Sequence, residues 1–580
     1  MIKKLINTPE SCVEEAVEGA MLTDSSLLKV EGLNILVRSD IAHIKSRFVT
    51  LISGGGSGHE PAHAGFIGEA MLSAAVLGNV FASPSVASIV AAIRVCAGPR
   101  GVLLIVKNYT GDRLNFGMAS EIAKQEGVDV MMVIVADDCA LPVDKGITGG
   151  RGIAGTVLVH KIAGAAAARG ACLADVHRLA CEAAARIGSL GVALSTCTVP
   201  GTPPSTRLSG GLMEVGMGIH GEPGREQMAL PAVGAADLVA QLLVDGILGV
   251  GRETPRLQHS AGQRVAVLLN NLGAVPVIEM QIVARSVMRS LLARGLVPVR
   301  AYVGPYCTSL EMCGVSLSLL TLDDLSLVSL DQHTTAPAWV KSSPLDLNTA
   351  DISTRTIPYT PTIAATPAAS LLLDVGVVGV AQRVCARITE LEPLLTQYDA
   401  ICGDGDCGIV MKKGALRVAA DVEVFGSATS VDASAFFTAV AVAVSASMGG
   451  TSGALLELCF RAMAASFTKT TQAGAGAGDA QAHWVAAIAA GVEAIQFYGG
   501  ATVGMRTMLD ALVPAVSALQ AGEGAAGAAA AATAGMEATK TMQSLAGRSN
   551  YVAEDSMNGT PDPGAVAVAE AFSVIAALSK

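Results

Sequence analysis

Residues 48–66 read FVTLISGGGSGHEPAHAGF, an apolar run that ends in a glycine-rich segment with two histidines. Similar apolar runs follow at 101–109 (GVLLIVKNY) and 129–138 (DVMMVIVADD), and each ends in polar residues. Helix-like segments lie between them, SVASIVAAIRVCA from Ser85 and GMASEIAKQEG from Gly117. Continuous apolar strands that alternate with helices are typical of a parallel sheet with helices on its faces. We therefore predict an α/β fold whose polar clusters gather at the carboxyl ends of the strands.

A second α/β part is predicted from about residue 191 to 333. VALSTCTVPG (192–201) and RVAVLLNNLG (264–273) resemble strands, and VIEMQIVARSVMRSLLARG (277–295) predicts a long helix. The composition then changes, because residues 334–369 are rich in Pro, Thr and Ser and show no hydrophobic periodicity. We interpret 334–369 as an interdomain linker. The predicted domains are therefore 1–333, in parts of about 1–190 and 191–333, and 370–580.

The last predicted domain, residues 370–580, is almost wholly helical. Its successive Ala-, Val- and Leu-rich segments contain few strand candidates, which indicates a helical bundle or barrel. Two low-complexity stretches interrupt the pattern, AGAGAGDAQA from Ala473 and AGEGAAGAAAAATAG from Ala521. Each is compatible with a flexible connection or with an alanine-rich helix.

Composition sets the class of protein. The 580 residues are too many for one core, and the 51% hydrophobic content is ample for several. The net charge of −11, without a dense Lys/Arg run, argues against a nucleic-acid partner. The twelve cysteines are scattered, which favours free thiols in a reducing compartment. We find no secretory h-region and no membrane span, and we expect a cytoplasmic protein.

The glycine-rich segment 54–66 is the first candidate site. Glycines that follow a strand leave backbone N–H groups free to hold an anion or a polar oxygen. The segment is not a Walker A motif, and a tight structural turn explains the glycines equally well. His59 and His63 are four residues apart and could share a helix face, but no third metal ligand is evident.

Two further segments carry chemistry in the α/β half. KNYTGDRLNFG (107–117) places Lys107 and Asp112 directly after a strand, where a general base would be held, although an ion-pair loop fits as well. MGIHGEPGRE places His220 between Gly218 and Gly221, which predicts an exposed turn. An exposed neutral imidazole can act as a base, a ligand or a nucleophile, whereas a core histidine is the alternative.

In the helical half, residues 399–408 read DAICGDGDCG. Three carboxylates, Asp399, Asp404 and Asp406, are separated by glycines that let the backbone bend, so they could converge on Mg²⁺ near phosphates. An EF-hand is excluded, because the twelfth position counted from Asp404 is Ala415. An acidic surface turn remains the alternative.

Small-residue turns open three apolar helices in the same half, MGGTSGALLE (448–457), GATVGMRTMLDAL (500–512) and the segment from Gly547. The N–H groups and hydroxyls of 449–452 could bind phosphates at a helix N-terminus. An ordinary capped helix explains any one of these segments.

Taken together, the motifs resemble those of single-chain, ATP-dependent dihydroxyacetone kinases, almost from end to end. GGGSGHEPAHAGF, GNVFASP, KNYTGDRLNFG, GRGIAGT and GIHGEPG match the substrate-binding K-type domain, and GDGDCG, MGGTSGAL, RTMLDAL, GRSNY and DPGA match the nucleotide-binding L-type domain. The resemblance implies an α/β K-type domain of two α/β parts, followed by an all-α L-type domain that forms an eight-helix barrel. It implies ATP as donor, because relatives that depend on a phosphotransferase system have separate chains.

The resemblance also implies roles for individual residues. His220 would bind the substrate carbonyl as a hemiaminal, Asp112 would be the acid/base, and His59 would hydrogen-bond the captured substrate. The implied substrate-binding residues are Gly56, Ser57, Gly58, His59, Lys107 and Asp112. The implied nucleotide-binding residues are Asp404, Gly405, Asp406, Cys407, Gly450, Thr451, Ser452, Gly491, Arg506, Asp562 and Gly564. Asp399, Asp404 and Asp406 would hold two Mg²⁺ ions.

The expected reaction is phosphorylation of dihydroxyacetone, and of glyceraldehyde, by a homodimer in which the K and L domains meet between subunits. Two alternatives stay open, an FAD-AMP lyase activity at the same nucleotide site with Mn²⁺, and a non-catalytic regulatory protein. Met411, Lys412, Lys413 and Met505 depart from the residues that relatives commonly have.

Overall fold

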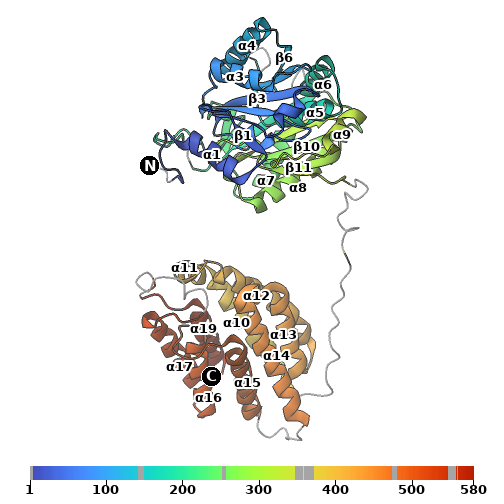
Figure 1. Cartoon of the computed structure of the whole chain (residues 1–580). Helices are drawn as coiled ribbons and strands as arrows, with labels where there is room; N and C mark the ends of the chain where they lie inside the picture. Colours follow the sequence, from blue (N-terminus) through green and yellow to red (C-terminus); the bar gives the residue numbers. More distant parts are fainter. Residues whose placement is uncertain are drawn as a thin grey trace. The chain divides into compact units, whose positions relative to one another are not determined.

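The structure is a computed structural model, and it describes residues 4–140, 149–208, 210–250, 257–345, 357, 371–472, 480–546, 557 and 559–579. The chain forms two compact units, Met1–Ile357 and Pro358–Lys580 (Figure 1). Within the described residues no helix has the length and the apolar character that crossing a bilayer requires.

The first sheet of the first unit is partly parallel. Its strands are β1 (Leu27–Lys29), β2 (Ile35–Arg38), β3 (Thr50–Ser57), β4 (Ala74–Val80), β5 (Val102–Lys107) and β6 (Val130–Val135), in the order β1-β2-β4-β3-β5-β6. The four strands β4, β3, β5 and β6 are parallel, as predicted. β1 and β2 are antiparallel additions that the sequence pattern did not predict.

Helices cover this sheet and connect its strands. They are α1 (Cys12–Thr23), α2 (Ile41–Ile44), α3 (Val86–Cys96), α4 (Thr110–Gln125), α5 (Thr156–Ala168) and α6 (Leu173–Ala185). The helix predicted from Ser85 is confirmed, and the Ser85 side chain caps it by accepting the Ser88 N–H. The helix predicted from Gly117 begins at Thr110, so most of the KNYTGDRLNFG segment is helical. Asp112 lies in the first turn, where a carboxylate suits the helix dipole.

The second sheet is mostly antiparallel, unlike the parallel sheet that alternating apolar strands and helices favour. Its strands are β7 (Ile187–Ala193), β8 (Leu212–Val215), β9 (Glu226–Ala229), β10 (Arg264–Asn271), β11 (Val297–Gly304) and β12 (Gly314–Thr321), in the order β11-β10-β12-β7-β8-β9. Only β10 and β11 are parallel among these pairs. A strand buried on both faces is continuously apolar whatever its direction, so the pattern does not encode direction.

The strand predicted from Val192 lies earlier, at Ile187–Ala193, whereas the strand over 264–271 and the helix from Val277 are confirmed. The helices of this half are α7 (Ala235–Leu248), α8 (Val277–Ala293) and α9 (Asp324–Asp331).

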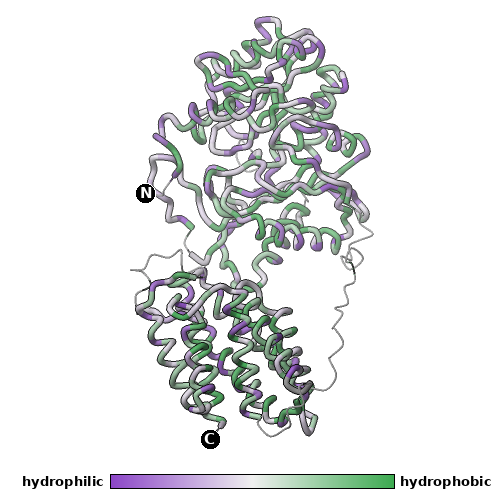
Figure 2. Tube along the Cα trace, turned by 60° about the horizontal axis from the view of Figure 1, so that its bottom comes forward, coloured by the Kyte–Doolittle hydropathy of each residue, from purple (hydrophilic) through white to green (hydrophobic). Residues whose placement is uncertain are grey.

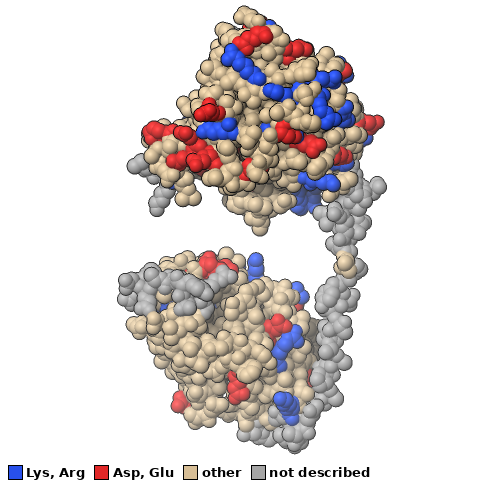
Figure 3. Space-filling view, in the orientation of Figure 1, with Lys and Arg blue, Asp and Glu red and all other residues tan. Residues whose placement is uncertain are grey.

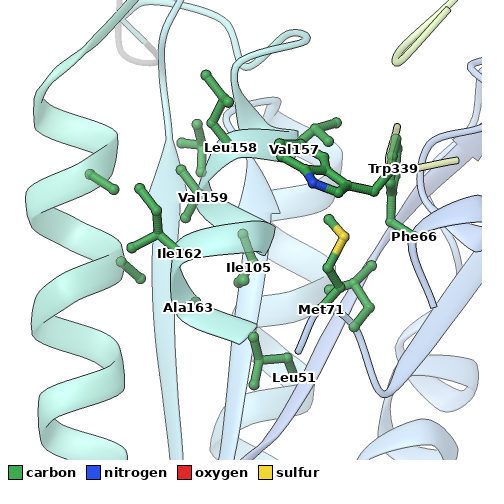
Figure 4. Close-up of a cluster of buried hydrophobic side chains, with 14 of the residues drawn as sticks. Leu51, Phe66, Met71, Ile105, Val157, Leu158, Val159, Ile162, Ala163 and Trp339 are labelled. Carbon is green, nitrogen blue, oxygen red and sulfur yellow. The ribbon is translucent and has the colours of Figure 1, made fainter. Parts of the chain in front are cut away.

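The predicted linker begins later than residue 334, because its first residues pack on the first unit. Ala338 donates its N–H to Gly65 O at 3.0 Å, and Trp339 is 8% exposed. Figure 4 shows the Trp339 ring beside Phe66 and near Met71, in a cluster that continues to Val157. Residues 346–356 and 358–370 of the predicted linker lie outside the described residues.

The second unit is a closed ring of helices. They are α10 (Gly376–Glu390), α11 (Glu392–Cys402), α12 (Cys407–Val422), α13 (Ala433–Ser447), α14 (Gly450–Gln472), α15 (Ala480–Gly499), α16 (Leu509–Gln520), α17 (Gly524–Ala538) and α19 (Pro563–Leu578). Apart from α11, each packs on the next, and α19 returns to α10, so eight helices of the described residues close the ring (Figure 1). This arrangement confirms the predicted eight-helix barrel. The short strands β13 (Leu372–Asp374) and β14 (Ser430–Asp432) pair beside it.

Apolar and small residues fill the ring. Figure 2 shows hydrophobic residues recurring along every helix of the second unit, and Figure 3 shows few charged side chains on the visible face of that unit. The low-complexity stretch from Ala521 is the alanine-rich helix α17, whose Ala528 and Ala532 are fully buried. Most of the other stretch, 473–479, and most of the segment from Gly547 lie outside the described residues.

Candidate active site

The glycines of β3 let the backbone approach the segment that follows β4. A Cβ on Gly56 would lie 2.6 Å from the Ala82 nitrogen, a distance that no side chain tolerates. Gly58 has φ +101° and faces the Phe81 ring, so it needs the conformational freedom of glycine. Ser57 turns away from this loop, because its Oγ donates to Gly78 O at 2.7 Å. The loop is therefore a closely packed backbone surface.

The two histidines of the loop point in different directions, so they do not share a helix face. His59 stacks on Phe81 with 4.9 Å between ring centroids, and its Nδ1 lies 2.9 Å from Thr308 O. His63 is buried in the core, where its Nδ1 lies 2.9 Å from His160 Nε2. Burial first, and then the charge of Lys107, lowers the pKa of both His59 and His63. Only His59 reaches the site.

His220 lies in the turn between β8 and β9, beside His59. Its Nε2 is 3.1 Å from His59 Nε2, and its Nδ1 is 2.7 Å from Glu222 Oε1. The rings of Phe81 and Tyr109 stand edge-on to it, at 5.0 and 4.8 Å between centroids. The predicted turn is present, but the histidine is not exposed as expected, because His220 is half-buried between aromatic rings, with 23% of its side chain exposed.

Three side chains from different parts of the first unit hold the backbone around His220. Arg151 donates to Gly216 O at 2.6 Å, and Arg207 donates to Gly221 O at 2.9 Å. Ser309 donates to the carbonyl of Ile219, the residue before His220. Arg151 is itself fixed by Asp138 in a buried ion pair of 2.6 Å. The position of the imidazole is thus set by contacts distant in sequence.

Lys107 and Asp112 lie together behind the glycine loop. A Cβ on Gly55 would be 3.8 Å from both Lys107 Nζ and Asp112 Oδ2, so the two groups flank the same glycine. Both side chains are buried, and Asp112 Oδ1 accepts no hydrogen bond from any described residue. Burial raises the pKa of Asp112, while the charge of Lys107 and a hydrogen bond from Ser83 act in the opposite direction. The Asp112 carboxylate thus has a raised pKa and one oxygen that is available to accept a proton, and both properties suit a general base.

The structure therefore brings most of the predicted substrate residues into one region. His59 contacts His220 directly. The charge of Lys107 lowers the pKa of His59, and the charge of His220 acts on the pKa of Asp112 in the same direction. Sequence reasoning missed Glu222, Phe81, Tyr109, Thr308 and Arg151. Glu222 and Arg151 belong to the quoted motifs GIHGEPG and GRGIAGT, so those motifs were the available signal.

The second unit holds a pocket of ≈ 190 Å³ at one end of the ring of helices. Its walls include residues at the beginnings of four helices, α12, α14, α16 and α19. Helix N-termini present free N–H groups and a positive dipole end, so their convergence suits an anion such as a polyphosphate. The predicted nucleotide residues that line it are Asp404, Asp406, Cys407, Gly450, Thr451, Ser452, Arg506, Asp562 and Gly564.

The three aspartates of DAICGDGDCG meet at this pocket. Asp399, Asp404 and Asp406 each offer a carboxylate oxygen, and these oxygens lie within 4.8 Å of one another. Asp399 Oδ2 also accepts the N–H groups of Asp406 and Cys407, at 2.9 and 3.0 Å, which folds the turn back onto α11. Gly405 has φ +79° in this turn, although it does not line the pocket. Three convergent carboxylates with adjoining space fit a hard dication such as Mg²⁺.

Arg506 and Asp562 form the buried side of the pocket. Arg506 is 1% exposed, and its guanidinium donates to Thr539 O and Thr560 O at 3.1 and 2.8 Å. Asp562 caps α19 by accepting the Ala565 N–H, and burial raises its pKa to about 6. Arg506 therefore fixes loops around the pocket as well as facing it.

Gly491 is not at the pocket. It lies within α15, and a Cβ there would be 2.6 Å from Cys459 Sγ on α14, so this glycine permits close helix packing. Two of the departures from the family pattern are also remote, since Met411 is in the core and Lys412 pairs with Glu392 at 3.2 Å.

Comparison with known proteins agrees with this arrangement. The Dak1 domain model matches residues 18–338, and the DAK2 domain model matches residues 401–577. The chain is 43% identical to a putative 3,4-dihydroxy-2-butanone kinase of Solanum lycopersicum, over 98% of this chain and 96% of that protein. It is 40% identical to the triokinase/FMN cyclase of Rattus norvegicus, over 99% and 98%.

A solved structure has the same organisation. The dihydroxyacetone kinase from C. freundii, in complex with AMP-PNP and Mg²⁺, aligns with a TM-score of 0.65 and 36% identity, covering 100% of both chains. The match thus covers both halves of the chain. The chain belongs to the dihydroxyacetone kinase family, in which a Dak1 domain is joined to a DAK2 domain.

Proposed function

We propose that this protein phosphorylates dihydroxyacetone, and also glyceraldehyde, with ATP. One observation carries the proposal. The first unit sets an imidazole nitrogen, His220 Nε2, in an aromatic-walled site near a buried carboxylate with an unused oxygen. This combination suits a small carbonyl compound with a hydroxyl group, because one group captures the carbonyl and the other removes the hydroxyl proton.

In the proposed reaction His220 Nε2 attacks the carbonyl carbon and forms a hemiaminal. A triose offers few contacts, so a reversible covalent bond fixes its orientation where hydrogen bonds alone would not. His59, whose Nε2 lies beside the reacting nitrogen, hydrogen-bonds the captured substrate. Glycerol has no carbonyl and escapes this capture.

Asp112 then takes the proton of the terminal hydroxyl, which becomes the nucleophile for the γ-phosphorus of ATP. Lys107, buried beside the same glycine, neutralises charge that develops on the substrate. Such transfers depend mainly on positioning and charge neutralisation.

In the second unit Asp399, Asp404 and Asp406 would hold Mg²⁺, and we propose two ions. When bound, Mg²⁺ neutralises the phosphate oxygens and orients the γ-phosphoryl group. The N–H groups at 450–452 and at the beginning of α19 contact the phosphates in this proposal. Support comes from the convergence of the carboxylates and from the relative whose structure contains AMP-PNP and Mg²⁺.

The central test is an ATP-coupled screen of dihydroxyacetone, glyceraldehyde and glycerol with the full chain. Dihydroxyacetone is expected to give the highest kcat/KM, and glycerol is expected to give almost no turnover. A preference for glycerol over both carbonyl compounds would overturn the assignment.

We also propose a homodimer in which the second unit of one subunit serves the first unit of the other. Mixing His220→Ala chains with Asp404→Ala chains tests this arrangement. A site shared between subunits predicts that the mixture recovers part of the wild-type activity, whereas a site within one chain predicts none.

A second candidate activity is the cyclising FAD-AMP lyase reaction at the same nucleotide pocket, supported by 40% identity to a protein named triokinase/FMN cyclase. Incubation with FAD and Mn²⁺ tests it, and the absence of released cyclic FMN would remove it. A purely regulatory role is disfavoured, because His220, Asp112 and the three aspartates are all present.

A further inference from the structure

Glu222 is the residue beside His220 for which the proposed reaction has so far given no role. Its Oε1 lies 2.7 Å from His220 Nδ1, and its Oε2 accepts the backbone N–H of His220 at 2.9 Å. Both carboxylate oxygens therefore contact the same residue, one at the ring and one at the backbone. Such a two-point contact fixes the rotation of the imidazole as well as its position.

The hydrogen bonds of the two histidines determine where their protons lie. Thr308 O is a carbonyl, which only accepts, so His59 Nδ1 carries a proton. The Glu222 carboxylate likewise requires a proton on His220 Nδ1. The two Nε2 atoms face each other at 3.1 Å, and this contact is a hydrogen bond only if one of them is protonated. The pair then carries three ring protons and one positive charge.

Charges around the pair are consistent with this count. Burial, followed by the charges of Lys107 and His220, lowers the pKa of His59, which favours the neutral Nδ1–H form of the His59 ring. Burial alone would raise the pKa of Glu222, but the hydrogen bonds from His220 prevail and lower it to about 2. The anionic Glu222 therefore balances the cationic pair.

We propose that Glu222, His220 and His59 store one proton for adduct formation, and that Glu222 is a positioning residue that directs His220 Nε2 to the substrate and balances the charge of the adduct. The role in adduct formation rests on the proposed function, whereas the stored proton is a property of the protein alone.

The step balances without an outside acid. The proton on His220 Nε2 moves to His59 Nε2 as the carbonyl compound enters. The freed Nε2 lone pair attacks the carbonyl carbon, the C=O π electrons move to oxygen, and His59 returns the proton to that oxygen. The product is a hydroxyl group on carbon and a cationic, Nε2-substituted imidazole that still donates Nδ1–H to Glu222. The total charge is the same before and after.

Other titratable groups face this triad from neighbouring elements. Lys107 is at the end of β5, Asp112 is on α4, and His63 lies beyond His59. Tyr109 and Arg151 interact electrostatically with each other, and both interact with Glu222. Asp138 forms an ion pair with Arg151. Glu222 is the carboxylate that hydrogen-bonds the His220 ring, so its removal is expected to act on the stored proton directly.

The first experiment is ¹⁵N NMR of the histidine-labelled full chain without substrate, with His220→Asn used for assignment. We expect both ring nitrogens of His220 to give protonated-type signals, and His59 to be the neutral Nδ1–H tautomer. An unprotonated Nε2 on His220 in the wild-type chain would overturn the proton storage, whatever the enzyme does. In Glu222→Gln we expect the Nε2 proton of His220 to be lost.

The second experiment follows the adduct directly, with ¹³C2-labelled dihydroxyacetone and no ATP. The wild-type chain is expected to shift the C2 signal from the carbonyl region to the sp³ region, and Glu222→Gln is expected to lose most of that signal. Glu226→Gln is the matched control, because Glu226 is exposed and pairs with Arg225 away from the ring of His220. Unfolding temperatures of both variants separate a local effect from misfolding, and Glu222→Asp, which keeps the charge, is expected to retain more adduct.

Kinetics provide the third readout. A carboxylate that holds an imidazole in its tautomer can contribute up to about 10⁴-fold, and we expect Glu222→Gln to lower kcat/KM by about 100-fold or more. Most of the loss should be in KM, since capture precedes phosphoryl transfer. An unchanged His220 spectrum together with an undiminished adduct in Glu222→Gln would overturn the role of Glu222. A wild-type chain that forms no adduct would refute covalent capture, while the ¹⁵N spectrum still decides the stored proton.

Discussion

His59 Nε2 and His220 Nε2 lie 3.1 Å apart although 161 residues separate them in the chain. His59 follows β3 of the first sheet, and His220 lies between β8 and β9 of the second sheet. The contact therefore joins the two α/β parts of the first unit at the point where the substrate carbonyl is proposed to react.

Replacing His220 with alanine tests covalent capture. We expect dihydroxyacetone-dependent ATP consumption to fall by at least about 100-fold, because the triose loses the bond that orients it. A coupled kinase assay measures the loss, with His43→Ala, an exposed histidine of α2, as control. Unchanged turnover in His220→Ala would contradict the covalent mechanism.

Replacing Asp112 with asparagine tests the general base. General-base catalysis is typically worth about 10²–10⁴-fold, so kcat should fall within that range while the ¹³C adduct persists. The pH dependence has a definite sign, because the base must be ionised and burial raises its pKa. Activity should therefore decline on acidification at a higher pH than an exposed aspartate would give. Loss of the adduct in Asp112→Asn would instead place this residue in substrate capture.

Removing the metal tests the three-aspartate site. Calorimetric titration of AMP-PNP should show much weaker binding in EDTA than in Mg²⁺, since uncompensated carboxylates repel the phosphates. Asp404→Ala should abolish kinase activity, and any FAD-AMP lyase activity with it. The control is Asp421→Ala, because Asp421 forms a partly exposed ion pair with Arg417. Equal nucleotide affinity with and without Mg²⁺ would contradict a metal role for these aspartates.

The buried pair Arg151–Asp138 should matter for stability. Arg151→Met removes the guanidinium that pairs with the buried Asp138 carboxylate, and breaking such a pair costs about 3–5 kcal/mol of unfolding free energy. Arg178→Met, which removes an exposed arginine of α6, should change little. Denaturant unfolding of the full chain, followed through the transition of the first unit, measures both. Equal effects would mean that the buried pair contributes no more than a surface pair.

The sequence alone predicted much of this structure, and the misses have physical causes. The strands at 50–57, 102–107 and 130–135 were predictable because buried strands are continuous apolar runs. Strand direction in the second sheet was not, because such runs look the same in either direction. Trp339 was assigned to the linker, because a single buried ring among prolines and threonines produces no hydrophobic periodicity in the sequence.

Convergence was predictable where a motif brings residues together, as with His59 and His220, which come into contact, and with the aspartates 399, 404 and 406, whose oxygens lie within 4.8 Å of one another. Gly491 was misplaced because a glycine required for helix packing resembles one required for a ligand. Glu222 was missed although it follows His220 by two residues in GIHGEPG, because the sequence does not show that its carboxylate contacts the imidazole. Arg151 was missed because its partner, the Gly216 carbonyl, is distant in sequence.

The three anchors of the His220 turn come from separate places, Arg151 before α5, Arg207 before β8 and Ser309 between β11 and β12. The proposed nucleophile, His220, is therefore not in place until both sheets have formed and met. A chain that is partly folded, or cut between residues 221 and 309 so that Ser309 is lost, lacks one or more of these anchors and should capture reactive carbonyl metabolites less well. The proposed adduct would consequently serve as a readout of complete folding of the first unit, and stability variants could be scored by it without a separate folding probe.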